Sequence, residues 1–302
     1  MAHFLSISDL SGEYLLKVLD KSKDLKKKTT PDLKNKTLLL IFEKPSTRTR
    51  ISFTQAMYQL GGNVIALNAG ETQLGRGETV ADTARAISRY VDVVAARVYS
   101  HQSLVEMSQH SSIPVINALS DMEHPCQIMA DLLTIKEKFK RLEGLKLAYI
   151  GDGNNVCNSL LLGCSALRIS ISVASPKGYE PDNRILQLAR NISRPPYAVV
   201  DLMQDPSQAV KDADIVYTDT WVSMGDEKEK EKRLKAFRPY QVNDKLLSLA
   251  KPGCIFMHDL PAYRGNEVTD SVMDGPRSVV WDQAENRLHT EKAILLYALG
   301  KL

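Results

Sequence analysis

The stretch from Lys36 to Phe53, KTLLLIFEKPSTRTRISF, joins an apolar run, a proline turn and a polar helix start. The run from Lys36 to Phe42 predicts a buried strand. Pro45 fixes the turn, and Ser46 begins a helix that Gly61 and Gly62 end. A strand that leads directly into a helix is the unit from which parallel α/β sheets are built.

The same unit recurs along the chain and then begins a second series at LKLAYIGDG (145–153). Two successive series predict the α/β class, with two doubly wound parallel-sheet domains. The first helix is expected over 6–28, capped by Ser8. The charged run 226–235 is expected as a solvated helix. The other expected strands are 63–68, 91–99, 111–120, 170–176, 215–221 and 253–259, and the other expected helices are 78–90, 124–140, 155–167 and 181–192.

Composition excludes several classes of protein. The chain has 302 residues, is 43% hydrophobic and 25% charged, and carries a net charge of +3, which is too small to argue for a nucleic-acid surface. Its four cysteines form no Cys-x-x-Cys pair, so a reducing cytoplasm is favoured over a disulfide scaffold or zinc ribbon. No apolar run approaches the ~20 residues of a membrane span, and residues 1–28 lack the core of a signal peptide.

Ligands of open α/β sheets bind beyond the carboxyl ends of the strands, so the strand ends are searched first. Ser46 and Thr47 open a helix, whose unpaired N–H groups attract an anion, and Arg48 adds a fork that matches phosphate oxygens. Arg50 lies roughly 200° further around the helix and is expected in an internal ion pair. The alternative is a capped helix start that only faces solvent.

The third and fourth strands also end in polar residues. Arg97 ends the third strand, where a lone arginine is usually part of a surface ion pair. His124 and Gln127 lie three residues apart at the next helix start and therefore share one face. A neutral histidine and an amide are suitable donors to a carbonyl oxygen that gains charge. The alternative is a turn histidine without a chemical role.

The second series offers three further motifs. GDGNN (151–155) follows a strand, but Val156 breaks the Gly-x-Gly-x-x-Gly pattern, which argues against nicotinamide binding. In DTWVSMG (219–225), Asp219 could pair with an ammonium group and Ser223 suits a mobile loop. In FMHDLPAYRG (256–265), a buried strand ends in His258 and Asp259, which are either turn residues or reacting groups.

Together, STRTR, the strand-end arginine, HPCQ, DTWVSMG and H-x-LPAYRG occur in an order and spacing that resemble the aspartate/ornithine carbamoyltransferase family. GDGNN and SMG point to its ornithine-specific members. The resemblance covers essentially the whole chain, from the first helix to WDQAENRLH (281–289). It implies transfer of a carbamoyl group from carbamoyl phosphate to the δ-amine of L-ornithine, giving citrulline and phosphate, in arginine biosynthesis or citrulline breakdown.

The resemblance also implies the organisation of the protein. Residues 1–138 would bind carbamoyl phosphate, residues 139–285 would bind ornithine, and a helix over 286–302 would return to the first domain, with the active site in the interdomain cleft. No metal or organic cofactor is expected. The protein would be a cytoplasmic homotrimer, or an assembly of trimers, in which loop 68–79 with Gln73 and Arg76 reaches the neighbouring subunit's site.

Site residues carry over by position in this sequence. Arg97, His124 and Asp259 take the catalytic positions. The carbamoyl phosphate-binding positions are Ser46, Thr47, Arg48, Thr49, Gln73, Arg97, His124, Gln127, Asp259, Leu260 and Arg287. The ornithine-binding positions are Asn155, Asp219, Ser223 and Met224.

One position departs from the family, which usually has His-Cys-Leu-Pro where this chain has His258-Asp259-Leu260-Pro261. Our hypothesis is that Asp259 contacts the δ-amine and provides a place for its proton. In the alternative, Asp259 caps the turn before Pro261 and Asp219 alone handles the amine. Two rival functions stay open at this stage: transfer to another amine such as putrescine or lysine, and a catalytically impaired protein that only binds carbamoyl phosphate.

Overall fold

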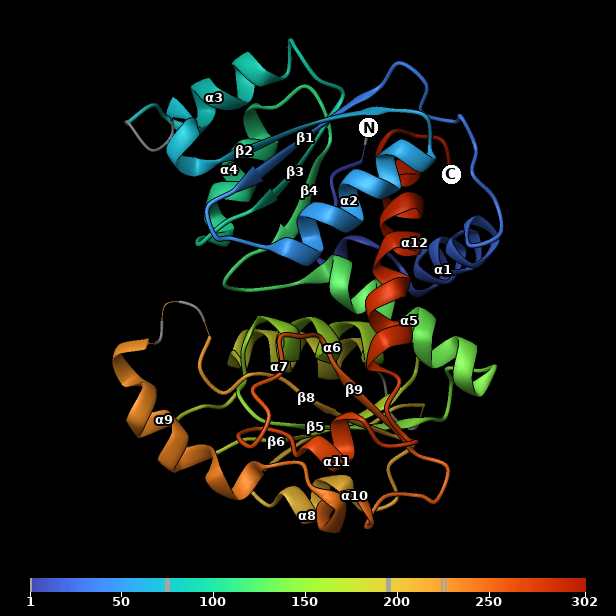
Figure 1. Ribbon diagram of the computed structural model, residues 1–302, viewed down its shortest axis with the longest axis vertical. Coiled ribbons are helices and arrows are strands. Elements are labelled where there is room, and N and C mark those ends of the chain that lie inside the picture. Colours follow the sequence, from blue (N-terminus) through green and yellow to red (C-terminus); the bar gives the residue numbers. More distant parts are fainter. Residues whose placement is uncertain (1, 74–76, 194–196, 224, 226) are drawn as a thin grey trace. The chain divides into compact units, whose positions relative to one another are not determined.

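The computed structural model describes residues 2–73, 77–193, 197–223, 225 and 227–302. The chain divides into two compact units, Met1–Leu133 with Glu285–Leu302, and Thr134–Ala284. Each unit contains one parallel sheet, of four and five strands respectively (Figure 1). The predicted α/β class with two parallel sheets is therefore confirmed.

The sheet of the first unit has the strand order β2-β1-β3-β4. All three pairings are parallel, and Phe42 at the end of β1 is in register with Arg97 at the end of β3. The carboxyl ends of these strands therefore lie along one edge of the sheet. The strands are β1 (Thr37–Phe42), β2 (Asn63–Asn68), β3 (Val93–Arg97) and β4 (Val115–Leu119).

The helices of the first unit follow its strands as the sequence predicts, with two exceptions. The expected helix 6–28 is a short 3-10 turn over Ile7–Asp9 and a separate helix α1, because Ser11 rather than Ser8 caps it by accepting a hydrogen bond from the Tyr14 N–H. Helix α4 was not expected. The helices are α1 (Gly12–Leu25), α2 (Thr47–Gln59), α3 (Val80–Ile87), α4 (His101–His110) and α5 (Pro125–Phe139), the last of which runs into the second unit.

The sheet of the second unit has the order β7-β6-β5-β8-β9, and all its pairings are parallel. The strand order changes at β5, because β6 and β7 follow on one side of it and β8 and β9 on the other. Doubly wound sheets bind ligands at such a switch point. The strands are β5 (Lys146–Ile150), β6 (Ser170–Ala174), β7 (Val200–Met203), β8 (Ile215–Thr218) and β9 (Ile255–His258). Strand β7 was missed because it lies at the edge of the sheet and has only one fully buried residue, so it lacks the continuous apolar run by which β8 and β9 were found.

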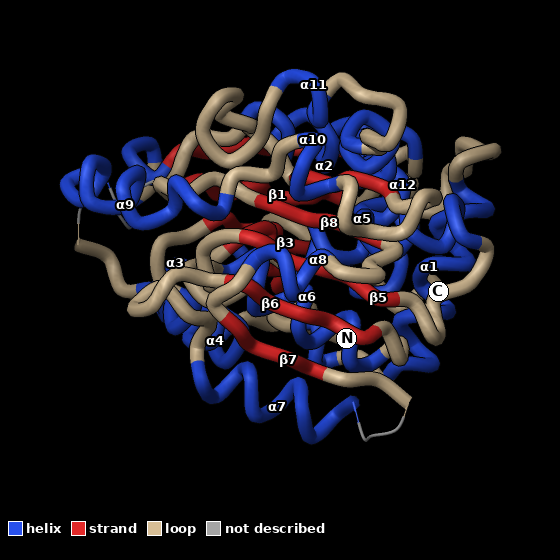
Figure 2. Tube along the Cα trace, turned by 90° about the horizontal axis from the view of Figure 1, so that it is seen from below, coloured by secondary structure: helices blue, strands red, loops and turns tan. Residues whose placement is uncertain are grey.

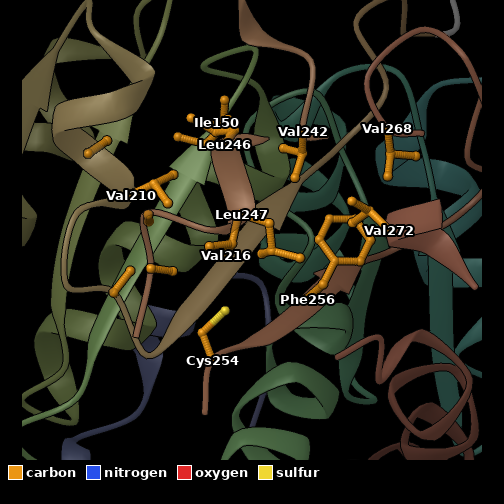
Figure 3. Close-up of a cluster of buried hydrophobic side chains, with 14 of the residues drawn as sticks. Ile150, Val210, Val216, Val242, Leu246, Leu247, Cys254, Phe256, Val268 and Val272 are labelled. Carbon is orange, nitrogen blue, oxygen red and sulfur yellow. The ribbon is translucent and has the colours of Figure 1, made fainter. Parts of the chain in front are cut away.

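Helices cover both faces of this second sheet (Figure 2). One face carries α6 (Asn155–Ala166) and α7 (Asn183–Ser193). The other face packs against three short helices, where Val216 and Phe256 of the strands contact a buried apolar cluster (Figure 3). These short helices are α8 (Pro206–Val210), α10 (Asp244–Leu247) and α11 (Asp270–Met273).

The last helix, α12 (Val280–Ala298), belongs to the first unit from Glu285 onward and lies beside α1 (Figure 1). Lys26 of α1 donates a hydrogen bond to Asn286 over 2.9 Å. Buried Lys292 donates to the Leu25 carbonyl over 2.6 Å and to Gln59 over 2.9 Å. The C-terminal helix is thus tied to the N-terminal sheet unit by polar contacts. Within the described residues, no helix combines the length and apolarity needed to cross a bilayer.

Candidate active site

Strand pairing places Arg97 next to the start of α2. The Glu43 N–H, just after β1, donates to the Arg97 carbonyl over 2.8 Å, and the Glu43 carboxylate accepts the Tyr99 N–H over 2.6 Å. The register between β3 and β4 shifts between Ala96 and Arg97. Such an irregularity re-aims the side chain that follows it. Arg97 therefore ends its strand at the same edge as the polar turn after β1.

The start of α2 has the features of an anion site. Ser46 is the N-cap, and its hydroxyl accepts the Thr49 N–H over 3.2 Å. Thr47 is exposed at the first helical position and Arg48 is half-buried, while Thr49 is fully buried. The first turn contains no acidic residue. The helix dipole and the remaining N–H groups at this end therefore favour a bound anion.

Arg50 takes a different direction from Arg48, as its position on the helix predicts. Its guanidinium donates to the Asn68 side-chain oxygen over 2.5 Å and lies 4.7 Å from the centre of the Phe42 ring. Arg50 thus contacts an amide and an aromatic ring, whereas the sequence suggested an internal ion pair.

His124 and Gln127 lie buried at the start of α5, with 2% and 1% exposure. The Gln127 amide group donates to the Asp131 carboxylate over 2.9 Å. Its side-chain oxygen is buried and has no hydrogen-bond partner among the described residues. The sequence suggested an amide donor at this position, but the group left available is the oxygen, which is an acceptor.

Arg287 of α12 completes this first half-site, which consists of the strand-end residues and helix starts of the first unit. Its Nη2 donates to the Thr49 hydroxyl over 2.9 Å and to the Glu291 carboxylate over 3.1 Å. Both Arg287 and Glu291 are buried. Burial raises the pKa of Glu291 to about 7, although Arg287 and the Ser52 hydroxyl act in the opposite direction.

Three further residues were named from the sequence, and the structure describes one of them. Gln73 is exposed after the short 3-10 turn Ala69–Glu71, and its backbone carbonyl accepts the Glu78 N–H over 3.1 Å. Arg76 and Met224 lie outside the described residues.

The second half-site is formed by residues that follow β5, β8 and β9 in the second unit. Asp219 comes directly after β8 and is 5% exposed. Its carboxylate accepts the Thr220 N–H and the Asn154 side-chain amide, each over 2.6 Å. Asn154 is also the N-cap of α6. The asparagine that contacts Asp219 is therefore Asn154, next to the predicted Asn155, which is the first residue of α6.

Asp259 lies in a buried network with three other acids and bases. The His258 Nδ1 is 3.5 Å from the Asp259 carboxylate, and Nε2 is 3.3 Å from Glu267. A hydrogen bond also joins Asp219 and Asp259. Asp219, His258 and Asp259 bring one ligand atom each within 4.8 Å of one another, so by distance these three could hold a cation. The predicted neighbours Asp219 and Asp259 are therefore brought together.

Burial raises the pKa of Asp219 well above its usual value, and the charge of Asp259 and the hydrogen bond with it act in the same direction. Two carboxylates so close favour sharing one proton. For His258, burial lowers the pKa, but Asp259 and Glu267 outweigh it and raise it to about 9. A pKa of about 9 alone would leave the ring protonated at pH 7, but the Leu260 N–H donates to Nδ1 over 2.9 Å, and a protonated ring has no acceptor at that nitrogen. The arrangement is therefore that of the neutral ring, with its proton on Nε2 toward Glu267.

Loop 219–225 begins at Asp219 and leads to α9 (Lys230–Phe237). Ser223 is half-buried, and Gly225 has a φ of 112°, which favours glycine. Arg233 of α9 is buried, donates to the Trp221 carbonyl over 2.6 Å and pairs with the Asp152 carboxylate. The charged run is thus not wholly solvated as expected, because Arg233 anchors the helix to the turn after β5.

The turn after β5 has a structural reason for its second glycine. A Cβ at Gly153 would lie 2.1 Å from the Pro181 backbone nitrogen and 2.3 Å from the Glu180 carbonyl carbon. This glycine accommodates the close approach of another segment of the protein backbone.

Comparison with known proteins identifies both halves of the chain. Residues 2–137 match the carbamoyl-P binding domain of aspartate/ornithine carbamoyltransferase, and residues 143–298 match its Asp/Orn binding domain. The chain belongs to the aspartate/ornithine carbamoyltransferase family. The first half-site, apart from Arg287, therefore lies in the region that matches the carbamoyl-P binding domain. Arg287 and the second half-site lie in the region that matches the Asp/Orn binding domain.

Relatives and solved structures of this family cover nearly the whole chain. An ornithine carbamoyltransferase of Methanosarcina acetivorans is 54% identical over 297 residues, covering 97% of each protein. The anabolic enzyme of Pyrococcus furiosus is 50% identical over 301 residues, covering 98% of this chain and 96% of that protein. A Pyrococcus furiosus structure superposes with a TM-score of 0.96 at 50% identity, covering 99% and 97% of the two chains.

Three residues of these carbamoyltransferase half-sites were missed by the sequence reasoning: Asn154, Glu267 and Glu291. Asn154 could have been found, because an asparagine at the N-cap position directly precedes the predicted helix. Glu267 and Glu291 carry no sequence signal. Each lies in a segment where a charged residue would normally be exposed, and only the fold buries it.

Proposed function

We propose that this chain transfers the carbamoyl group of carbamoyl phosphate to the δ-amine of L-ornithine, with the two half-sites binding one substrate each. The observation that carries the proposal is their opposite chemistry. The first half-site combines a helix N-terminus with Arg48, Arg97 and Arg287. The second contains the carboxyl groups of buried Asp219 and of Asp259, whose side chain is 11% exposed. An anionic phosphate and a cationic amine need these two environments.

The phosphate binds to Ser46, Thr47, Arg48 and Thr49 at the start of α2. Arg287 supports this turn, since it donates to the Thr49 hydroxyl over 2.9 Å. Leu260, two residues after the end of β9, contributes to the binding of the same substrate.

The carbamoyl group lies against Arg97, His124 and Gln127. Arg97 and His124 stabilise the carbonyl oxygen, which gains negative charge when the amine attacks. The buried Gln127 oxygen has no partner among the described residues and accepts a hydrogen bond from the carbamoyl NH2 group. This combination of donors and one acceptor distinguishes a carbamoyl group from an acetyl group, which lacks the NH2 donor.

Ornithine binds through Asn155, Asp219, Ser223 and Met224, with its δ-amine at Asp219 and Asp259. Freeing the lone pair of an ordinary amine with a pKa of about 10.4 costs roughly 4–5 kcal/mol at pH 7. The carboxyl pair orients the ammonium form and receives the proton that nitrogen loses. The nitrogen then attacks the carbamoyl carbon and a C–N bond forms. The C–O bond to phosphate breaks, and the leaving phosphate takes the second proton from the nitrogen.

Binding order follows from the separation of the two half-sites along the chain. The groups for carbamoyl phosphate, apart from the segment after β9, come from the first unit, so this substrate binds without ornithine. Ornithine follows and draws the loop at 223–225 inward. Calorimetry with norvaline, which lacks the δ-amine, distinguishes the schemes. Tight norvaline binding to the free protein, unaffected by a carbamoyl phosphate mimic, would contradict the ordered scheme.

The active protein is a homotrimer, or an assembly of trimers, in the cytoplasm. Exposed Gln73 donates a hydrogen bond to the phosphate bound by a neighbouring subunit. Subunit exchange between an inactive Gln73→Ala protein and an inactive Arg48→Gln protein should restore part of the activity, because some hybrid sites contain neither substitution. A fully active monomer would contradict the shared site.

The decisive test is a colorimetric citrulline assay with carbamoyl phosphate and a panel of amines. Ornithine should give the highest kcat/KM, and putrescine and lysine should react poorly because they lack one of the contacts or the correct length. Equal rates with putrescine would show that loop 219–225 does not read the amino-acid end of the substrate. No product with any amine would refute the activity.

A further inference from the structure

We propose that Glu291 is a positioning residue that holds Arg287 for carbamoyl phosphate and takes up a proton when the phosphate binds. The inference rests on the proposed role of Arg287 in that site. None of the contacts expected from the family reaches Glu291, which contacts substrate only through the arginine.

Arg287 has two hydrogen-bond partners, one in the turn that receives the phosphate and one on its own helix. One is the Thr49 hydroxyl at 2.9 Å, in the helix turn that receives the phosphate. The other is the Glu291 carboxylate at 3.1 Å, one helical turn further along α12. Both charged side chains are almost completely buried, with 3% and 0% exposure. The guanidinium is therefore fixed between the phosphate turn and an internal anion.

The surroundings of Glu291 supply little other compensation for a negative charge. Its Oε2 is buried and receives no well-aligned hydrogen bond from the described residues. The groups that face the carboxyl are Arg287 on its own helix, the Ser52 hydroxyl on α2 and the Cys126 thiol on α5. The neighbouring Lys292 points instead to Leu25 and Gln59. Arg287 is thus its one cationic partner among these groups.

Binding of a phosphate dianion changes this balance. The positive charge of Arg287 is then shared between two anions, and the ligand's charge disfavours the ionised form of Glu291. Burial has already brought the pKa of Glu291 to about 7, so a small further increase protonates it near neutral pH. The proton comes from solvent and goes to the Glu291 carboxyl, and no other bond forms or breaks. Affinity for carbamoyl phosphate should therefore fall as the pH rises above 7.

The test uses Glu291→Gln, which keeps an acceptor for Arg287 but removes the charge, and Glu285→Gln as the matched control. Glu285 lies on the same helix with a 59% exposed side chain. The probe is phosphonoacetamide, in which a methylene group replaces the bridging oxygen of carbamoyl phosphate. Calorimetry between pH 6 and 8.5, in buffers of different ionisation enthalpy, gives the dissociation constant and the number of protons taken up. The ligand's own titration is common to all three proteins and cancels in the comparison.

Wild type and Glu285→Gln should take up about half a proton more than Glu291→Gln at pH 7.5. Their affinity should fall about tenfold relative to Glu291→Gln across the pH range. Equal proton uptake by wild type and Glu291→Gln would overturn the proposal. No binding by any of the three proteins would overturn it together with the carbamoyl phosphate site on which it rests.

A second measurement covers the case in which Glu291→Gln does not fold. Infrared difference spectroscopy of the wild-type protein at pH 7.5 should show a new C=O stretch of a protonated carboxyl when phosphonoacetamide binds. Labelling with 13C-glutamate should shift that band. Absence of a glutamate-derived band would contradict proton uptake by Glu291.

Discussion

Both half-sites keep charged groups away from water, but the two half-sites offer opposite charges to their substrates. In the first unit, Arg287 is buried beside Glu291, and the pair leaves a cation available to an anionic substrate. In the second, Asp219 and Asp259 lie together beside a neutral His258 and leave negative charge for an amine. Each half-site therefore contains one carboxyl group whose pKa is raised, Glu291 to about 7 and Asp219 well above its usual value. The comparison shows two roles for a buried acid. In the first unit it holds an arginine in place, and in the second it contacts the substrate.

The largest expected effect comes from the cation of the first half-site. Arg48→Gln should lower kcat/KM for carbamoyl phosphate by about 10³-fold, because a charged donor to the phosphate is lost. Arg50→Gln is the matched control, two residues away on the same helix but directed to Asn68 and Phe42. It should change kcat/KM by less than about fivefold. Steady-state citrulline rates measure both, and equal losses would show that the helix start, not Arg48, is being damaged.

The next effect concerns the carboxyl pair of the second half-site. Asp259→Asn should lower kcat/KM for ornithine about 10²-fold, because the amide keeps the shape but cannot receive a proton. Phosphonoacetamide affinity should stay nearly unchanged. Asp259→Cys, the usual family residue, should keep activity and gain sensitivity to thiol reagents. Wild-type kinetics of Asp259→Asn from pH 6 to 9 would show that Asp259 only caps its turn.

A third, smaller effect is on the pH dependence of stability, which tests the raised pKa of Glu291. The pKa of Glu291 rises from 4.5 in the unfolded chain to about 7. The stability that the protonated Glu291 side chain adds to the folded protein is fully present below pH 4.5. It is lost as the pH rises to 7 and is absent above that. Glu291→Gln should therefore match wild type near pH 4.5 and exceed its free energy of unfolding at pH 8 by on the order of 2–3 kcal/mol. Denaturant unfolding at both pH values measures this, and a difference independent of pH would contradict the raised pKa.

The smallest expected effect is on cysteine reactivity, which differs between this chain and a protein with the family cysteine. All four cysteines are buried, and burial raises the pKa of Cys126 and Cys157, which lie close to the two half-sites. A thiol with a raised pKa reacts slowly. Iodoacetamide at pH 8 should therefore leave citrulline formation nearly unchanged. Rapid inactivation, with Asp259→Cys no more sensitive than wild type, would show that a buried thiol becomes accessible.

The sequence predicted the parallel sheets and the strand-end motifs because continuous apolar strands and helix caps are local signals. It placed Ser46 and His124 at helix starts, and Arg97 and Asp219 at strand ends, where the structure has them. It could not predict that Gln127 donates to Asp131, because that contact depends on side-chain direction within α5. It could not predict Glu291 either, since nothing local distinguishes a buried glutamate from an exposed one. The missing information is the packing of distant segments.

The return of α12 to the first unit has a consequence for how the protein is made. Arg287 and Thr49 are 238 residues apart in sequence, yet one hydrogen bond joins them. A ribosome releases the phosphate turn before the second unit and the arginine after it, so the nascent first unit remains without helix α12 throughout synthesis of the second unit. Domains that form during translation normally close as they emerge. Here the anion-binding unit reaches its complete form only after the second unit has been synthesised.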